Sequence, residues 1–161
     1  MKYCKKCIQP DTRPGIKFDD EGICNPCRYY ETLSAVDWEE RRSQIEEIAQ
    51  WAREKSTSEY DCIVSVSGGK DSHRLALFAR NELGLMPLLV STVAPPQHQT
   101  KIGTENLANL VSLGFDMITV APAPEVWRKL MRKSFFDYAN YCKSTELALY
   151  ASAPRVAIAY E

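Results

Sequence analysis

Residues 61–80, DCIVSVSGGKDSHRLALFAR, place a strand, a glycine turn and a helix directly after one another. Residues 61–66 are apolar and rich in β-branched side chains, which predicts a short buried strand. Ser67-Gly68-Gly69-Lys70-Asp71-Ser72 follows at once, and residues 73–80 are typical of a helix. Glycines allow the backbone to approach a ligand closely, and a helix N-terminus presents free amides and a positive dipole end. The stretch therefore predicts an anion-binding loop.

Two common nucleotide-binding loops do not fit this sequence. The Walker A loop requires a glycine where this chain has Val64, and a hydroxyl residue where it has Asp71. The dinucleotide fingerprint Gly-x-Gly-x-x-Gly is also absent. The sequence from Ser67 to Ser72 instead resembles the pyrophosphate loop (PP-loop) of the ATP-pyrophosphatase superfamily, whose fold is of the adenine nucleotide α-hydrolase type.

The resemblance implies ATP and Mg²⁺ as cofactors, with a substrate oxygen attacking the α-phosphate. It implies that Lys70 neutralises the departing pyrophosphate and that Asp71 helps to hold Mg²⁺, which makes these two the candidate catalytic residues. The other expected donors to the phosphates are Ser67, Gly68, Gly69 and Ser72. The superfamily places adenine near the end of the second strand, beside Val90 and Thr92.

The sequence after the loop continues the alternation of strands and helices. Residues 86–93 and 116–120 are predicted strands, and residues 106–113 predict a helix between them. Such alternation favours an α/β fold with a doubly wound parallel sheet, here assigned to residues 59–161. The loop after the second strand, with Pro95, Pro96 and His98, is expected on the ligand side of that sheet.

Four of the six cysteines form two Cys-x-x-Cys pairs near the start of the chain. Four thiolates complete a tetrahedral shell that suits Zn²⁺ and leaves no open position for catalysis. The intervening stretch is rich in proline and glycine and can bury little apolar surface, so bound metal would supply folding energy. Residues 1–32 are therefore a predicted structural zinc ribbon, with an iron–sulfur cluster as the alternative; the expected ligands are Cys4, Cys7, Cys24 and Cys27.

A linking helix is predicted within residues 33–58. Asp37 is a suitable N-cap, acidic residues follow in the first turn, and apolar residues then recur at nearly helical spacing. Ser56-Thr57-Ser58 is expected to end the helix and to mark the boundary of the larger domain.

Composition argues against several classes of protein. The 161 residues carry 20 basic and 21 acidic side chains, without the basic excess typical of nucleic-acid-binding proteins. The sequence has no apolar run long enough for a membrane span, and the cysteine motif begins at once, without a secretory signal. We therefore expect a cytoplasmic protein for which nucleic acid is not the main partner.

Several segments together resemble the N-acetyl sugar amidotransferase family of lipopolysaccharide and other surface-polysaccharide biosynthesis. They are residues 3–16 (YCKKCIQPDTRPGI), 18–24, 37–41, 60–64 and 150–157, together with the loop. The resemblance implies that an N-acetyl group of a nucleotide-linked or carrier-linked sugar is adenylated, and that ammonia then displaces AMP to leave an acetamidino group. It also implies a separate glutaminase subunit as the ammonia source and a cyclase-like companion subunit.

The chain is much shorter than members of that family, so its domain is expected to be incomplete at the C-terminus. Two alternatives remain. One is a tRNA-thiolating ATP pyrophosphatase, although only Cys62 and Cys142 lie outside the ribbon and the charge is balanced. The other is a truncated, non-catalytic chain whose zinc ribbon docks a partner.

Overall fold

The structure is a computed structural model that describes residues 1–95 and 98–160. Pro96, in the predicted loop after the second strand, lies outside the described residues. The chain divides into two compact units, Met1–Gln44 and Ile45–Glu161, and the division falls inside one long helix. Among the described residues, no helix combines the length and the apolar character that crossing a bilayer requires.

The first unit has little regular structure. Two isolated antiparallel bridges, Tyr3 with Pro10 and Phe18 with Cys24, form its turns. Helix α1 (Asn25–Thr32) follows, then the 3₁₀ turn η1 (Leu33–Ala35) and the first part of helix α2 (Trp38–Lys55). The predicted cap of α2 is confirmed, because the Asp37 carboxylate accepts hydrogen bonds from the amides of Glu39 and Glu40 at 3.0 and 2.9 Å.

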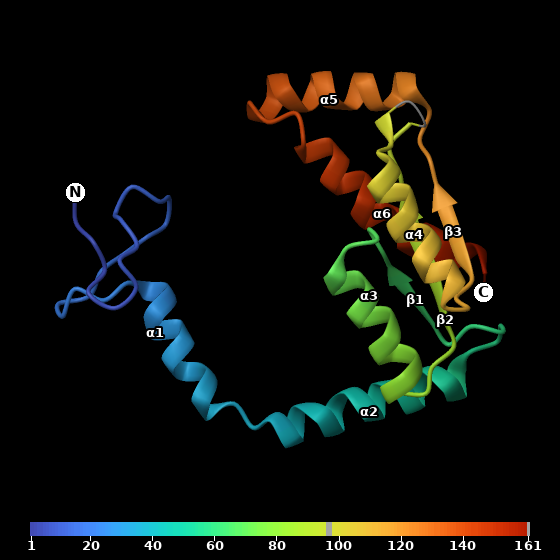
Figure 1. Ribbon diagram of the computed structural model, residues 1–161, viewed down its shortest axis with the longest axis horizontal. Coiled ribbons are helices and arrows are strands. Elements are labelled where there is room, and N and C mark those ends of the chain that lie inside the picture. The colour runs from blue at the N-terminus through green and yellow to red at the C-terminus, as the bar shows by residue number, and fades with distance from the viewer. Residues whose placement is uncertain (96–97, 161) are drawn as a thin grey trace. The chain divides into compact units, whose positions relative to one another are not determined.

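The second unit is a mixed α/β structure built on a three-stranded parallel sheet (Figure 1). The strands are β1 (Cys62–Ser65), β2 (Pro87–Thr92) and β3 (Met117–Val120), in the order β1-β2-β3. The helices are α3 (Lys70–Leu77), continued by the π-helical turn η2 (Phe78–Glu82), then α4 (Lys101–Ser112), α5 (Pro124–Tyr138) and α6 (Lys143–Ala159). The predicted α/β class and parallel strands are thus confirmed.

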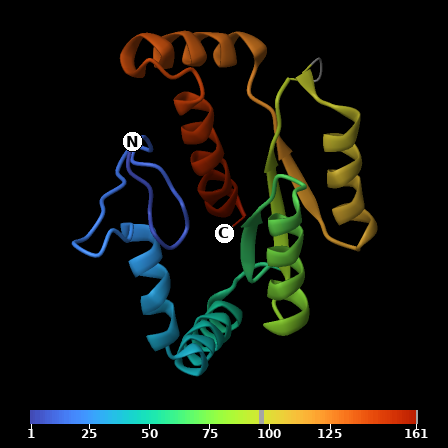
Figure 2. The same cartoon turned by 60° about the vertical axis from the view of Figure 1, so that its left-hand side comes forward.

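Helices cover both faces of this sheet. Helices α3 and α4 lie on one face and α6 lies on the other (Figure 2). The core is made by side chains of β1 and β2 with those of α3 and α4, and its largest fully buried members are Leu89 and Leu110. Strand β2 is buried along nearly its whole length, as expected for the central strand of a parallel sheet.

Candidate functional site

The four cysteines of the two Cys-x-x-Cys pairs come together in the first unit. Their sulfur atoms all lie within 4.8 Å of one another, with Cys4 Sγ 4.0 Å from Cys27 Sγ and Cys7 Sγ 3.6 Å from Cys24 Sγ. Tetrahedral zinc–thiolate bonds of about 2.3 Å would place the sulfurs roughly 3.8 Å apart, whereas a disulfide needs about 2.05 Å. The cysteines are therefore free thiols that could hold one metal ion such as zinc.

The first pair lies in a tight turn closed by backbone hydrogen bonds. The Cys4 amide donates to the Gln9 carbonyl and the Ile8 amide donates to the Cys4 carbonyl, both at 2.9 Å. Ile8, directly after the second cysteine of the pair, has a φ of 55°. A β-branched residue in this left-handed region is strained, so the turn is held against a local backbone preference.

The second pair spans the start of helix α1. Cys24 is the residue before the first turn and Cys27 lies within that turn, so the helix fixes their spacing. Before them, the Asp19 carboxylate accepts hydrogen bonds from the amides of Glu21 and Ile23 at 3.0 and 2.9 Å. This local bonding closes the loop that returns the chain to the first pair.

The electrostatics of the cluster favour a thiolate at Cys4 and oppose thiolates at Cys24 and Cys27. Burial raises the pKa of Cys4, but backbone amides of Cys24, Cys7 and Lys6 outweigh it and lower that pKa to about 6. Hydrogen bonding with Cys7, followed by burial, raises the pKa of Cys27 to about 12, and burial chiefly raises the pKa of Cys24. A divalent cation would remove this conflict, because it stabilises all four sulfurs as thiolates.

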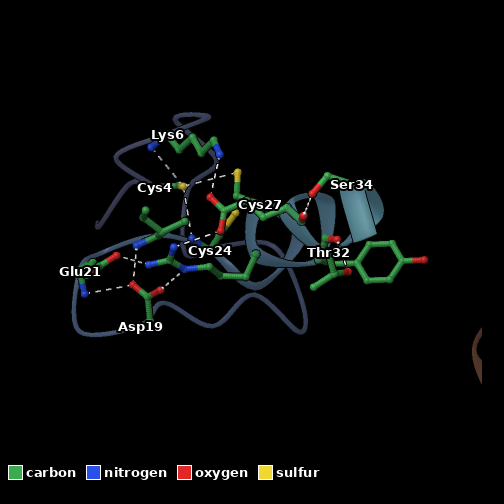
Figure 3. Close-up of polar contacts among 12 residues, drawn as sticks. Cys4, Lys6, Asp19, Glu21, Cys24, Cys27, Thr32 and Ser34 are labelled. Carbon is green, nitrogen blue, oxygen red and sulfur yellow. Dashed lines mark hydrogen bonds and ion pairs between the residues drawn. The ribbon is translucent and has the colours of Figure 1, made fainter. Parts of the chain in front are cut away.

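An ionic network beside the cluster joins the two turns to α1 (Figure 3). The Arg28 guanidinium contacts Asp19 at 2.6 Å, Glu31 at 3.1 Å and also Glu21. Glu31 in turn pairs with Lys6 at 2.7 Å. These contacts lower the pKa of Glu31, with Lys6 as the main cause and Arg28 as the second. Sequence reasoning missed this network, because its charges are far apart in the chain and follow no motif.

The predicted anion-binding loop lies at the carboxyl end of β1. Gly68 has a φ of 78°, and Gly69 has extended backbone as the residue before α3. A Cβ atom on Gly68 would lie 3.0 Å from Cβ of Asn106 and 3.3 Å from Cδ2 of Leu107, both on α4. Glycine at residue 68 is therefore needed for the turn and for the close approach of α4.

The start of α3 leaves backbone donors free. The Gly69 carbonyl accepts three hydrogen bonds, from the Ser72 hydroxyl at 2.9 Å and from the amide and Nδ1 of His73, each at 3.1 Å. No side chain caps the helix, and no hydrogen bond from the amides of residues 70–72 is seen in the described part of the chain. Because a carbonyl oxygen only accepts, this contact requires a proton on Nδ1 of His73 and leaves Nε2 as the acceptor of the neutral ring.

The two candidate catalytic side chains lie beside each other at the start of α3. Lys70 Nζ is 3.0 Å from Asp71 Oδ1, and the side chains of both residues are more than nine-tenths exposed. An exposed pair of this kind is weak and screened by water, so an incoming phosphate and its cation could readily separate it.

The residues expected beside adenine lie on β2, next to the loop. The Val66 amide donates to the Val90 carbonyl at 2.9 Å, and β1 pairs with β2 through Ser65 and Val90. Continuing this register places Ser67 level with Thr92, which is half-buried at the carboxyl end of β2. Val90 as a whole residue is only 2% exposed and its carbonyl is already paired with Val66, so it offers a ligand almost no accessible surface.

No protein-family model matches the chain. A comparison with curated proteins likewise finds no match. What points to a function is therefore the chain's own residues and contacts, together with the resemblance of its motifs.

Proposed function

We propose that the chain uses ATP to adenylate an oxygen atom of an organic substrate, with release of pyrophosphate. The observation that carries this proposal is the loop from Ser67 to Ser72, a glycine turn that leads from a parallel strand into a helix with uncapped amides. Backbone amides and a helix N-terminus in this position suit the β- and γ-phosphates of ATP. Lys70 would add a point charge there, and Asp71 would supply an oxygen ligand for Mg²⁺.

The arrangement of the sheet supports the same proposal. In open parallel sheets, ligands bind in the crevice beyond the carboxyl ends of the strands. The loop follows the carboxyl end of β1, and Thr92 lies at the corresponding end of β2. We infer a doubly wound domain of the adenine nucleotide α-hydrolase type, with adenine bound near the end of β2.

The substrate class is inferred from the resemblance to N-acetyl sugar amidotransferases. The acetamido oxygen of the sugar attacks the α-phosphorus of ATP, forming a P–O bond while the bond to pyrophosphate breaks. Ammonia then adds to the activated carbon, AMP departs with that oxygen, and loss of a proton leaves the acetamidino group. A glutaminase subunit would supply the ammonia, and a cyclase-like subunit would accompany the chain. The zinc ribbon would have a structural role, because four cysteines fill the coordination shell of the metal.

The test is the identity of the nucleotide product. The zinc-loaded chain is incubated with ATP, Mg²⁺ and ammonium, with N-acetylated sugar nucleotides in one set and bulk tRNA plus a sulfur donor in the other. We expect AMP and pyrophosphate only with a sugar, and a sugar product whose mass shows oxygen replaced by NH. AMP only with tRNA would establish thiolation instead, and no AMP in either set would favour a docking role.

Two lysines provide matched variants for this assay. Lys70 and Lys101 are the first residues of α3 and α4, and both side chains are about nine-tenths exposed. Lys70→Ala is expected to lower the rate of AMP formation on the order of 10²-fold, as removal of a charge-stabilising donor does. Lys101→Ala should leave it unchanged. Equal rates in the two variants would contradict a phosphate-binding role for the loop.

A further inference from the structure

A cavity lies at the same end of the sheet as the loop. It has a volume of about 390 Å³ and is lined by residues that follow β2 and β3 and by the start of α6. No residue of the loop from Ser67 to Ser72 lines it. The lining residues that matter for its chemistry are Pro95, Pro124, Trp127, Arg128, Met131 and Thr145.

The chemistry of the walls is selective. Trp127, Met131 and the two prolines give a mainly apolar surface, and none of the described residues that line the cavity carries a carboxylate. Arg128, an exposed residue at the rim, is the one permanently charged residue among them, and no ion pair or hydrogen bond of its side chain is found within the described part of the chain. An arginine without a partner, beside apolar walls, suits a ligand that combines an apolar face with an anionic group.

The corner behind this cavity also holds unsatisfied polar groups. Among the described residues, only two buried side-chain atoms lack a hydrogen-bond partner, Trp127 Nε1 and Ser144 Oγ. Trp127 is 7% exposed and lines the cavity, and Ser144 precedes its wall residue Thr145. Orphan buried donors are uncommon and require an explanation such as a bound water or ligand.

The walls are held in place before any ligand arrives. The buried Ser134 hydroxyl donates to the Asn140 carbonyl at 2.7 Å and accepts from the Ser144 amide at 3.2 Å. These two bonds lock the turn between α5 and α6, the two helices that carry Trp127, Arg128 and Thr145. A preformed cavity loses less free energy in ordering itself when a ligand binds.

We propose that this cavity binds the second substrate of the reaction, an anionic acceptor molecule with an apolar face, rather than ATP. The proposal rests on the proposed function, because an adenylating enzyme must hold its acceptor beside the nucleotide. The sugar ring and its acetyl group would pack on Trp127 and the prolines, and a phosphate of the carrier would meet Arg128. With the triphosphate of ATP assigned to the loop from Ser67 to Ser72, the neutral adenine would gain much less from the charge of Arg128.

The test uses the emission of Trp127. In the full chain with Trp38→Phe and Trp51→Phe, two exposed sites, Trp127 is the remaining tryptophan. A panel of N-acetylated sugar nucleotides, including UDP-N-acetylglucosamine, and separately ATP with Mg²⁺ are titrated without turnover. We expect a saturable change with a sugar nucleotide, weakened at least about tenfold by Arg128→Met. Lys129→Met, at an exposed neighbour on α5, is the matched control and should change the affinity less than about twofold.

Three results would overturn the proposal. They are no saturable response to any sugar nucleotide, an equal response in Arg128→Met, and a response to ATP that Arg128→Met abolishes. The AMP assay separates this failure from failure of the proposed function. Sugar binding that depends on Arg128, without AMP formation, would leave the cavity assigned and refute the reaction. AMP formation with unchanged sugar affinity in Arg128→Met would do the reverse.

Discussion

Replacing Gly68 by alanine should destabilise the second unit through two separable effects. The φ of 78° puts any L side chain into the left-handed region, which costs about 1–2 kcal/mol. The new Cβ would also lie 3.0 Å from Cβ of Asn106 and 3.3 Å from its carbonyl carbon, so α4 must move away from the loop. Overpacking of this kind costs about 1–3 kcal/mol, and the two effects together predict a loss of about 2–5 kcal/mol.

Gly84 provides the matched control. Its φ is 64°, but a Cβ atom there would meet nothing within 4 Å. Gly84→Ala should therefore lose only the conformational part, about 1–2 kcal/mol. The difference between the two variants, measured by urea unfolding followed through tryptophan emission, isolates the contact between the loop and α4. Equal losses would refute the reasoning, because they would show that α4 does not restrict the loop.

A third variant tests the partner atom directly. Asn106→Gly removes the Cβ that lies 3.0 Å from the new methyl group, while the carbonyl carbon at 3.3 Å remains. Combined with Gly68→Ala, it should recover part of the loss beyond the sum of the single changes, since residues in contact are not additive. ATP affinity should follow the same order if the loop holds the phosphates. Strict additivity would show that the clash is relieved elsewhere.

Four further predictions concern other parts of the chain. Ile8→Gly should raise the stability of the zinc-bound first unit by about 1 kcal/mol, because it relieves the strain of a β-branched residue in the left-handed region. The gain should appear as a higher chelator concentration at the midpoint of zinc removal. Cys24→Ser should lower bound zinc well below one ion per chain by metal analysis and reduce helical circular dichroism, whereas Cys142→Ser, outside the cluster, should do neither. Ser134→Ala should cost about 1–3 kcal/mol in urea unfolding, because it leaves the buried amide of Ser144 without its acceptor. The hydrogen bond from the Tyr60 hydroxyl to Asp116 raises the pKa of Tyr60. The stability that this bond contributes is therefore complete below the unfolded-state pKa near 10 and is lost as pH rises through the higher folded-state pKa. Tyr60→Phe should remove that part of the fall in stability above pH 10, measured by urea unfolding.

The strands could be read from the sequence because their signals are local. The predicted strands at residues 61–66, 86–93 and 116–120 each contain an observed strand that is slightly shorter than predicted. The helix predicted at residues 106–113 begins earlier, at Lys101, because the Thr100 hydroxyl caps it by accepting from the Gly103 amide at 3.1 Å. That cap was not anticipated, since Gly103 lowers the helical propensity of the first turn.

The last two helices, α5 and α6, were harder to predict than the strands. Helix α5 was missed altogether, although Pro124 at its start and Glu125 in its first turn are ordinary signals for a helix N-terminus. In α6 the buried residues are Ser144 and Ser152, while Leu147, Tyr150 and Ile158 are exposed. The sequence does indicate a helix over residues 147–160, and the observed helix begins earlier, at Lys143, because the small buried residues that let it approach the sheet give no apolar periodicity to mark its start.

The same contrast applies to the candidate site. The cysteine cluster and the glycine loop are each specified by residues close together in sequence, so both could be located from the amino-acid sequence alone. The spacing of the cysteines in the sequence allowed either zinc or an iron–sulfur cluster. The short distances between the sulfur atoms add that a single ion such as zinc could fit among them. The network around Arg28 and the contact of Gly68 with α4 depend on segments far apart in the chain, and no local pattern encodes them.

If ATP binds at the loop and the acceptor binds in the cavity, variants at the two places should have different effects on the two affinities. The loop is shaped by the backbone of β1 and α3, whereas the cavity is shaped by the turn between α5 and α6, and none of its wall residues comes from the loop. Changes in the loop should therefore alter ATP affinity without changing the response of Trp127 to a sugar nucleotide, and Arg128→Met should do the opposite. Ser134→Ala would disturb the cavity through its fold alone, so its effect on sugar affinity should scale with its loss of stability. An effect of Arg128→Met that exceeds any change in stability would then mark direct recognition of the acceptor's charge.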